Sequence, residues 1–348
     1  MTESQQNNLE NMRVEGENSF LKRVKNNLER LEIVRLSKMK VYQFRKKIGI
    51  PLAIVLTPIC AFADWMLLTR PSSGDDDAFG ITFMVLGGLY WWVTQPKRDY
   101  AKAYKKDILP KLSETLGLKY RHKGKIPLRE IKPSKIVPSH DRYTTDDYFE
   151  GSYKNVGIKF SEIDLEVRRR SNKRTYYVSV FKGLAILLEM DRKKFNGHTI
   201  LQKNEAKFIE WFKEKSSGMK RANMVDPEFE KAFDAYTTDQ VEARYLIDPK
   251  IIEELKSVSA EYDGKKMTAA YFDNKVLVMI ASKTNHFEPA DLSVKATDPI
   301  SILSMRQELL QILSLIDRLD LYDPYALQAE QDNVIANPPD QDKTNEAV

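Results

Sequence analysis

The sequence predicts an α+β protein in which a two-helix transmembrane hairpin is followed by a mixed α+β cytoplasmic domain with antiparallel hairpins. Two apolar runs lie close together near the N-terminus, and basic residues flank both of them. Beyond residue 143, strand patterns and helix patterns are mixed without the regular strand–helix alternation of a parallel sheet. That mixture favours an α+β domain.

The two apolar runs are long enough to be membrane spans. Ile48–Leu68 holds 21 residues with one charge, Asp64, and Ala78–Val93 holds 16 with none, or 18 when the next two residues are included. A helix rises about 1.5 Å per residue, so it needs about 20 residues to cross a bilayer core of about 30 Å. We therefore predict spans at 48–68 and 78–95. A buried helical hairpin in a soluble protein is the alternative, but it leaves the basic flanks unexplained.

The charge distribution orients this hairpin. Lys22–Lys47 carries a net charge of +8 and Lys97–Lys125 one of +7, which leaves −10 for the rest of a chain whose total is +5. The loop between the runs has Arg70 against three aspartates, Asp75–Asp77. Lys and Arg near the ends of membrane helices are retained on the cytoplasmic side. We therefore predict a protein of the cell inner membrane with two spans and both termini in the cytoplasm.

Composition and periodicity divide the remainder of the chain. The polar stretch 1–18 is predicted to be disordered. Over 19–47, Val24, Leu28 and Leu31 recur at helical spacing and predict a basic amphipathic helix, which either lies on the membrane, self-associates, or packs on the main domain. The other predicted parts are a basic helix and proline-containing linker over 96–142, the cytoplasmic domain over 143–325, and a disordered tail over 326–348.

Strand patterns open the main domain. Val156, Ile158 and Phe160 alternate as in a half-buried strand, and Thr175–Met190 predicts a second strand with Gly183 at a bulge or bend. Asp273-Asn274 separates two apolar runs by two residues, which predicts a tight β-hairpin.

Helix starts are marked by capping residues. Aspartate followed by proline suits the first turn of a helix, and three such pairs occur, at Asp226, Asp248 and Asp298. Asp239 and Glu242 have the spacing of a capping box. Helices are also expected at 204–215 and from residue 299 onward.

The search for catalytic motifs returns little. No glycine-rich phosphate loop and no Gly-x-Ser-x-Gly elbow occur, and there is a single cysteine, Cys60. The four histidines, His122, His140, His198 and His286, have no His or Cys at ligand spacing. We therefore predict no catalytic residue, no metal and no cofactor.

The function expected from this is a membrane-anchored cytoplasmic binding or scaffolding protein that is not an enzyme. Its partners would be the bilayer and an unidentified protein or a second copy of the chain. The alternative is a membrane-bound enzyme with a site assembled in the cytoplasmic domain around the polar residues Asp239, Glu242, Arg244 and His198.

Two basic surfaces suggest anionic partners. The residues nearest the spans are expected either to bind anionic lipid headgroups or only to fix the orientation. The tip Arg168–Arg174 could touch phosphates, but it has no interleaved aromatic residues in sequence, which favours a solvated turn and disfavours nucleic acid. The expected headgroup contacts are Lys38, Lys40, Arg45, Lys46, Lys47, Lys97, Arg98 and Lys102.

Two further features lie within the apolar runs. Asp64 is one helical turn from the end of its run, where a carboxylate can reach water. Gly80, Gly87 and Gly88 would allow another helix to approach closely.

Five short motifs resemble a bacterial membrane family known as domain-of-unknown-function family 3137. They are Glu150-Gly151 with Phe160-Ser161-Glu162, Phe181–Leu184, Phe195–Thr199, Asp226–Glu230 and Asp239–Tyr245. The resemblance covers roughly 97–322, and two preceding membrane helices are usual in such proteins. It implies a membrane-anchored cytoplasmic domain and supplies no catalytic residues.

Overall fold

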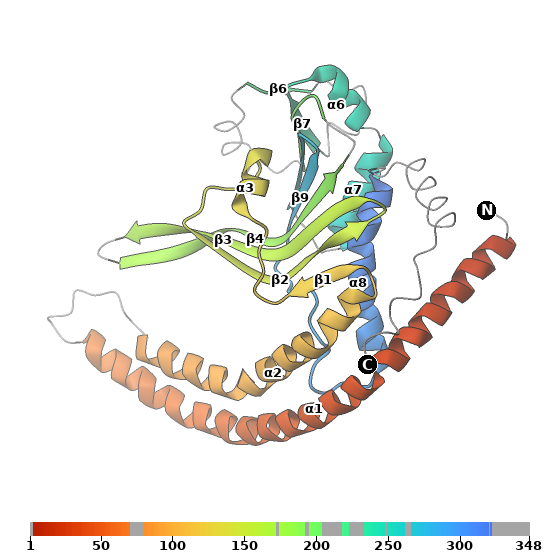
Figure 1. Cartoon of the computed structure of the whole chain (residues 1–348). Helices are drawn as coiled ribbons and strands as arrows, with labels where there is room; N and C mark the ends of the chain where they lie inside the picture. The colour runs from red at the N-terminus through yellow and green to blue at the C-terminus, as the bar shows by residue number, and fades with distance from the viewer. Residues whose placement is uncertain are drawn as a thin grey trace, which may run out of the picture. The chain divides into compact units, whose positions relative to one another are not determined.

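The computed structural model describes residues 3–69, 80–171, 174–191, 195–203, 218–222, 233–247, 249–261, 266–319 and 321 (Figure 1). The chain forms two compact units. The first comprises Met1–Leu112 with Phe287–Arg306, and the second comprises Ser113–His286 with Gln307–Val348.

Two long helices make up most of the first unit. α1 (Glu3–Leu68) is 66 residues long and contains the first apolar run, and it begins within the stretch that we predicted to be disordered. α2 (Gly80–Glu114) contains the described part of the second run. Each helix continues through two prolines, Pro51 and Pro58 in α1 and Pro96 and Pro110 in α2.

The two helices contact each other at several points, and Figure 1 shows them side by side. A Cβ on Gly49 of α1 would lie 2.6 Å from Val93 of α2, so this glycine permits a close approach. Nothing lies within 4 Å of the corresponding position on Gly80, Gly87 or Gly88, so no described residue of the chain makes a close approach at these three.

One described helix meets the length and composition expected of a membrane span. It is the part of α1 from Val24 to Leu67, whose most apolar stretch is almost entirely exposed. No second helix in the described ranges meets the same criterion. The described part of α2 starts at Gly80 and soon reaches Gln95, Lys97 and Arg98, which shortens its apolar stretch.

The second unit is built on one antiparallel sheet, which within the described residues has nine strands in the order β1-β2-β3-β4-β9-β8-β5-β7-β6. This confirms the α+β class and the antiparallel hairpins. The strands are β1 (Leu118–Arg121), β2 (Arg142–Tyr153), β3 (Val156–Ser171), β4 (Arg174–Met190), β5 (Thr199–Lys203), β6 (Lys220–Arg221), β7 (Phe233–Thr237), β8 (Lys266–Phe272) and β9 (Lys275–Ala281).

The strands β8 and β9 and the second half of β4, residues 183–190, are buried on both faces. One face packs against the segment that holds α3 (Leu128–Ile131) and a 3-10 turn, η1 (Lys132–Ser134), through side chains such as Ile131, Leu187 and Leu277. This segment lies in the stretch that we predicted as a linker, yet its apolar residues belong to the core. Figure 1 shows α3 on one side of the sheet and α7 (Pro249–Glu261) on the other.

Several local predictions are confirmed. Asp273-Asn274 forms the two-residue turn between β8 and β9. Gly183 in β4 has a φ of +152°, and a Cβ there would meet the Ile280 carbonyl oxygen at 2.0 Å, although the register shift between β3 and β4 lies a few residues away, at Leu165/Glu166.

The predicted helix starts also hold where they can be examined. α7 begins at Pro249 and α8 (Pro299–Arg318) at Pro299, where the Asp298 carboxylate accepts a 3.0 Å hydrogen bond from the Ile300 amide. The predicted helix at 204–215, the Asp226-Pro227 start, the loop between the spans and the tail over 326–348 lie outside the described residues.

Candidate functional site

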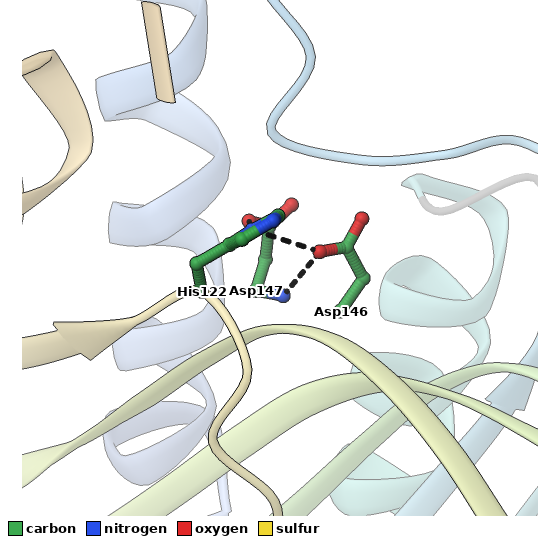
Figure 2. A group of neighbouring side chains, drawn as sticks. All are labelled: His122, Asp146 and Asp147. Atoms are coloured by element: carbon green, nitrogen blue, oxygen red, sulfur yellow. Dashed lines mark hydrogen bonds and ion pairs between the residues drawn. The ribbon is translucent and has the colours of Figure 1, made fainter. Parts of the chain in front are cut away.

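Three side chains of types that can bind a metal meet where His122 follows the end of β1 and where Asp146 and Asp147 lie within β2, as Figure 2 shows. His122 Nδ1 lies 3.2 Å from Asp146 Oδ1 and 3.9 Å from Asp147 Oδ1. One ligand atom from each residue lies within 4.8 Å of the other two. His122 and Asp146 are exposed or half-buried, whereas Asp147 is buried.

A bulge in β2 creates this arrangement. Asp146 pairs with Glu162 and Phe149 with Phe160, so β2 has one extra residue between these pairs. Asp147, inside the bulge, adopts a left-handed φ of +51°. The Tyr120 hydroxyl, on the neighbouring strand β1, donates a 2.6 Å hydrogen bond to Asp147 Oδ1.

The group offers one imidazole nitrogen and two carboxylates. This mixed donor set suits a divalent cation such as Mn²⁺ or Zn²⁺, and without a cation it suits a His–Asp ion pair. His122 has no partner at ligand spacing in the sequence, because the two aspartates come from another strand. Two consecutive aspartates in a strand run against strand preference, and that was the one signal available.

The polar residues proposed for an enzyme site have structural partners. Asp239 caps α6 (Gln240–Leu246), since its carboxylate accepts from the amides of Val241 and Glu242 at 2.9 and 3.1 Å. Glu242 does not complete the predicted capping box. Its carboxylate instead accepts from the Asn196 and Gly197 amides at 2.7 and 2.5 Å.

The loop that Glu242 holds is closely fitted. A Cβ on Gly197 would lie 2.7 Å from Asp239 Cβ and 2.9 Å from Glu242 Oε2, so only glycine fits there. Next to it, the His198 amide donates to the Thr238 hydroxyl at 2.8 Å, and the Thr238 amide donates to the His198 carbonyl at 3.1 Å. Two segments forty residues apart are thereby joined through backbone and side chain.

The His198 ring is packed against other residues of the domain, whereas Arg244 is exposed to solvent. His198 Nε2 lies 2.9 Å from the Ser134 carbonyl, to which it must donate, and the ring stacks on Phe272. Burial lowers the pKa of His198. Arg244 is exposed on α6. Asp239 and Glu242 therefore lie against the backbone of Gly197, whereas the His198 ring nitrogen binds the Ser134 carbonyl.

The predicted headgroup residues fall into two groups. Four of them have partners within the chain. Lys38 pairs with Asp99 at 2.9 Å, and Lys97 pairs with Asp291 at 2.6 Å. The two arginines donate hydrogen bonds to residues of α2, and each lies over a tryptophan ring. These arginines are Arg45, over Trp92, and Arg98, over Trp91. The other four are exposed, namely Lys40, Lys46, Lys47 and Lys102.

The segment before α8 is held to α1 and α2 by charged groups of the same unit. Arg35 forms two hydrogen bonds with Glu32, at 2.8 and 2.6 Å, and also donates to the Leu292 carbonyl. Glu32 accepts from the Ala296 amide at 2.7 Å, and the Arg35 guanidinium lowers the pKa of Glu32. Lys105 pairs with Glu288 at 2.6 Å. Basic residues that flank the apolar runs, Arg35, Lys97 and Lys105, thus bind the segment before α8.

Residues 179–321 match the model of a family described as "Protein of unknown function (DUF3137)". No curated protein and no solved structure matches the chain. The DUF3137 match begins after the Glu150-Gly151 and Phe160-Ser161-Glu162 motifs, and it does not include the apolar runs.

The structure explains two motifs within the DUF3137 segment. Phe195–Thr199 is the loop whose amides are bound by Glu242, and Asp239–Tyr245 is the helix start that supplies this carboxylate. Each motif therefore provides the binding partner of the other, which is a structural reason for both.

Proposed function

We propose that this protein is a membrane-anchored binding or scaffolding protein whose two helical spans, at 48–68 and 78–95, leave both termini in the cytoplasm. The α+β domain would then lie at the cytoplasmic face of the inner membrane. The proposal rests on the apolar surface of α1 and α2.

Much of that surface is exposed in the part of the chain that the structure describes. Large apolar side chains from Ile48 to Leu67 are exposed on α1, and Phe83 and Met84 are exposed on α2. Soluble proteins rarely expose apolar patches beyond a few hundred Å². The one carboxylate in the first run, Asp64, is hydrogen-bonded to α2, so the lipid-facing surface would carry no charge. Trp65 lies near the end of the first apolar run and Trp91 near the end of the second, and both are exposed, as expected of side chains at the headgroup level.

A binding role is favoured over catalysis by what the polar candidates do. Asp239 caps a helix, Glu242 binds backbone amides, and the His198 ring donates to the Ser134 carbonyl. Each group is thereby engaged in holding the fold.

Headgroup binding is assigned to the four exposed lysines, Lys40, Lys46, Lys47 and Lys102. Each would contribute about 1 kcal/mol near an anionic leaflet. Lys38, Arg45, Lys97 and Arg98 contribute less because their charges already have partners in the chain. Replacing the exposed four by Gln should weaken binding of the detergent-purified chain to phosphatidylserine nanodiscs more than replacing the paired four. Equal losses would contradict this assignment.

Reporter fusions test the anchoring itself. A reporter that is active only outside the cytoplasm should be active when inserted at Ser73 and silent when fused after Val348. The opposite pattern would overturn the orientation. Recovery of the chain in the soluble fraction after cell lysis would overturn the membrane anchoring, whatever the reporters show.

The group His122, Asp146 and Asp147 supports a second candidate function, the binding of a divalent cation by the cytoplasmic domain. The observation that favours it is the placement of three ligand atoms within 4.8 Å of one another, one of them on a buried carboxylate. Manganese titration tests this function.

A further inference from the structure

The ends of β3 and β4 form a ribbon that has no other strand beside it in the described chain. β2 pairs with β3 only as far as Glu166, and β9 pairs with β4 only from Gly183 onward. Residues 167–171 and 174–178 therefore pair only with each other, and Figure 1 shows this ribbon projecting from the sheet. We call these residues the β3–β4 ribbon.

The register of the ribbon interleaves arginines with aromatic side chains, which the sequence alone did not show. Arg169 lies opposite Tyr176, and Arg168 lies opposite Tyr177. Residues directly opposite each other in an antiparallel pair share a face. Our expectation that the basic tip lacks aromatic neighbours was therefore wrong, because those neighbours come from the other strand.

The two faces of the ribbon differ. One face carries Arg168, Arg170 and Tyr177, and the Arg142 guanidinium covers the Tyr177 ring at 3.3 Å from its centroid. The other, which we call the open face, carries Val167, Arg169, Arg174, Tyr176 and Val178. On the open face Tyr176 is 49% exposed and Val178 is 41% exposed.

We propose that the open face of the β3–β4 ribbon is a second membrane contact, which binds the surface of a bilayer that contains anionic lipid. The ribbon carries four arginines and no acidic residue, so its charge is complementary to phosphate headgroups. Exposed Tyr176 and Val178 would enter the interfacial region of the bilayer. An amphipathic ring and an apolar side chain are both more stable there than in water.

A lipid surface fits this face better than a nucleic acid does. Phosphate contacts along a nucleic acid backbone would satisfy the arginines but would leave Val178 in water. A bilayer interface satisfies both the charge and the apolar area. The inference rests on the proposed anchoring, which holds the domain near the bilayer at a high effective concentration.

A fluorescent label on the ribbon tests the proposal in the full-length chain. Cys60 is the one cysteine, so Cys60→Ala allows a single new cysteine at Val178→Cys to carry an environment-sensitive dye. The matched control is Tyr245→Cys, because Tyr245 is 81% exposed on α6. Each labelled chain is reconstituted in vesicles of phosphatidylcholine alone or of phosphatidylcholine with phosphatidylserine.

The proposal predicts a blue shift and quenching by nitroxide lipid for the ribbon label in phosphatidylserine vesicles only, and neither for the control. Replacing Arg169 and Arg174 by Gln should reduce the ribbon's contact by about fivefold per arginine. Replacing Arg168 and Arg170 should reduce it less, because they lie on the far side of the backbone and the Debye length is about 8 Å.

Three outcomes would overturn the proposal. The first is an identical response of the ribbon label in both vesicle types, and the second is an equal response of the control label. The third is a shift caused by added duplex DNA but not by phosphatidylserine, which would make the ribbon a nucleic-acid contact. Vesicle flotation separates these from a failure of the anchoring, because an unanchored chain would not float with either vesicle.

Discussion

Asp64 on α1 and Thr82 on α2 are joined twice: the Thr82 hydroxyl donates to Asp64 Oδ2 at 2.7 Å and the Thr82 amide donates to the same oxygen at 3.0 Å. The Ile81 amide donates to Asp64 Oδ1 at 3.1 Å. The carboxylate thus binds the free amides at the start of α2 from a different helix. We had expected it to reach for water; it instead has three donors within the protein.

This contact predicts that Asp64→Leu destabilises the helix pair. Loss of a capping carboxylate costs about 0.5–2 kcal/mol, and the amides of residues 81 and 82 would lose their acceptor. Asp64→Asn keeps one carbonyl acceptor and should cost less than half as much. Thermal unfolding of the full chain in detergent micelles measures both. Thr82→Val, which removes the hydroxyl alone, should fall between wild type and Asp64→Leu; an unchanged melting temperature for Asp64→Leu would contradict the role.

The loop held by Glu242 gives a second prediction. Glu242→Ala leaves two amides without their carboxylate, and Gly197→Ala places a methyl group within 2.9 Å of Glu242 Oε2. Each change should lower stability by about 1–3 kcal/mol. Their combination should cost less than the sum of the two because they disrupt one contact. Denaturant unfolding measures these values.

Arg244→Ala is the matched control for this loop. The side chain is exposed on the same helix, so its loss should change stability by no more than about 0.5 kcal/mol. A loss as large as that of Glu242→Ala would show that the contacts of Glu242 are not what stabilises this region.

Local signals in the sequence predicted much of the fold. The Asp273-Asn274 turn, the helix starts at Pro249 and Pro299 and the cap by Asp239 depend on residues close in sequence, and the structure confirms them. The α+β class followed from the same local patterns. A turn or a cap depends on a few adjacent dihedral angles, which neighbouring residues determine.

Contacts between distant residues could not be predicted. Glu242 had the spacing of a capping box, but its carboxylate binds amides more than forty residues away. His122 meets Asp147 only because β2 contains a bulge, and Tyr176 meets Arg169 only through the strand register. One residue of register moves a side chain to the other face, and no local pattern specifies it that closely.

Burial of histidine predicts a dependence of stability on pH. Burial lowers the pKa of His198 in the folded chain, while its pKa in the unfolded chain is about 6.5. As the pH falls below about 6.5, the unfolded state takes up a proton before the folded state does, so stability decreases with falling pH. Above that value this group contributes no slope.

His198→Phe tests the origin of this slope. The variant should be less stable than wild type at pH 8 by about 1 kcal/mol, because the buried Ser134 carbonyl loses its donor. Its stability should, however, fall less between pH 7 and 5 than that of wild type. Some slope will remain, since burial also lowers the pKa of His286. Melting temperatures across that range give the comparison, and parallel curves would rule out His198 as a source.

Cation binding by His122, Asp146 and Asp147 gives the last prediction. With one imidazole and two carboxylates within 4.8 Å, the site should bind one Mn²⁺ per chain, measured as loss of the free-ion resonance signal during titration. The bound ion should raise the melting temperature by mass action, with about 2.7 kcal/mol of stabilisation at a hundredfold excess over the dissociation constant.

The two more accessible residues of the group, His122 and Asp146, are the ones to substitute. Replacing buried Asp147 would also remove the acceptor of the Tyr120 hydroxyl. His122→Ala and Asp146→Ala should each weaken Mn²⁺ binding at least about tenfold, the cost of roughly 1.4 kcal/mol of lost coordination. His140→Ala is the control, since its ring Nδ1 lies 2.8 Å from the Pro138 carbonyl and outside the group. Equal Mn²⁺ affinity in wild type and His122→Ala, or no saturable binding in wild type, would leave these three side chains as an ion pair between strands and remove the cation from the proposed function.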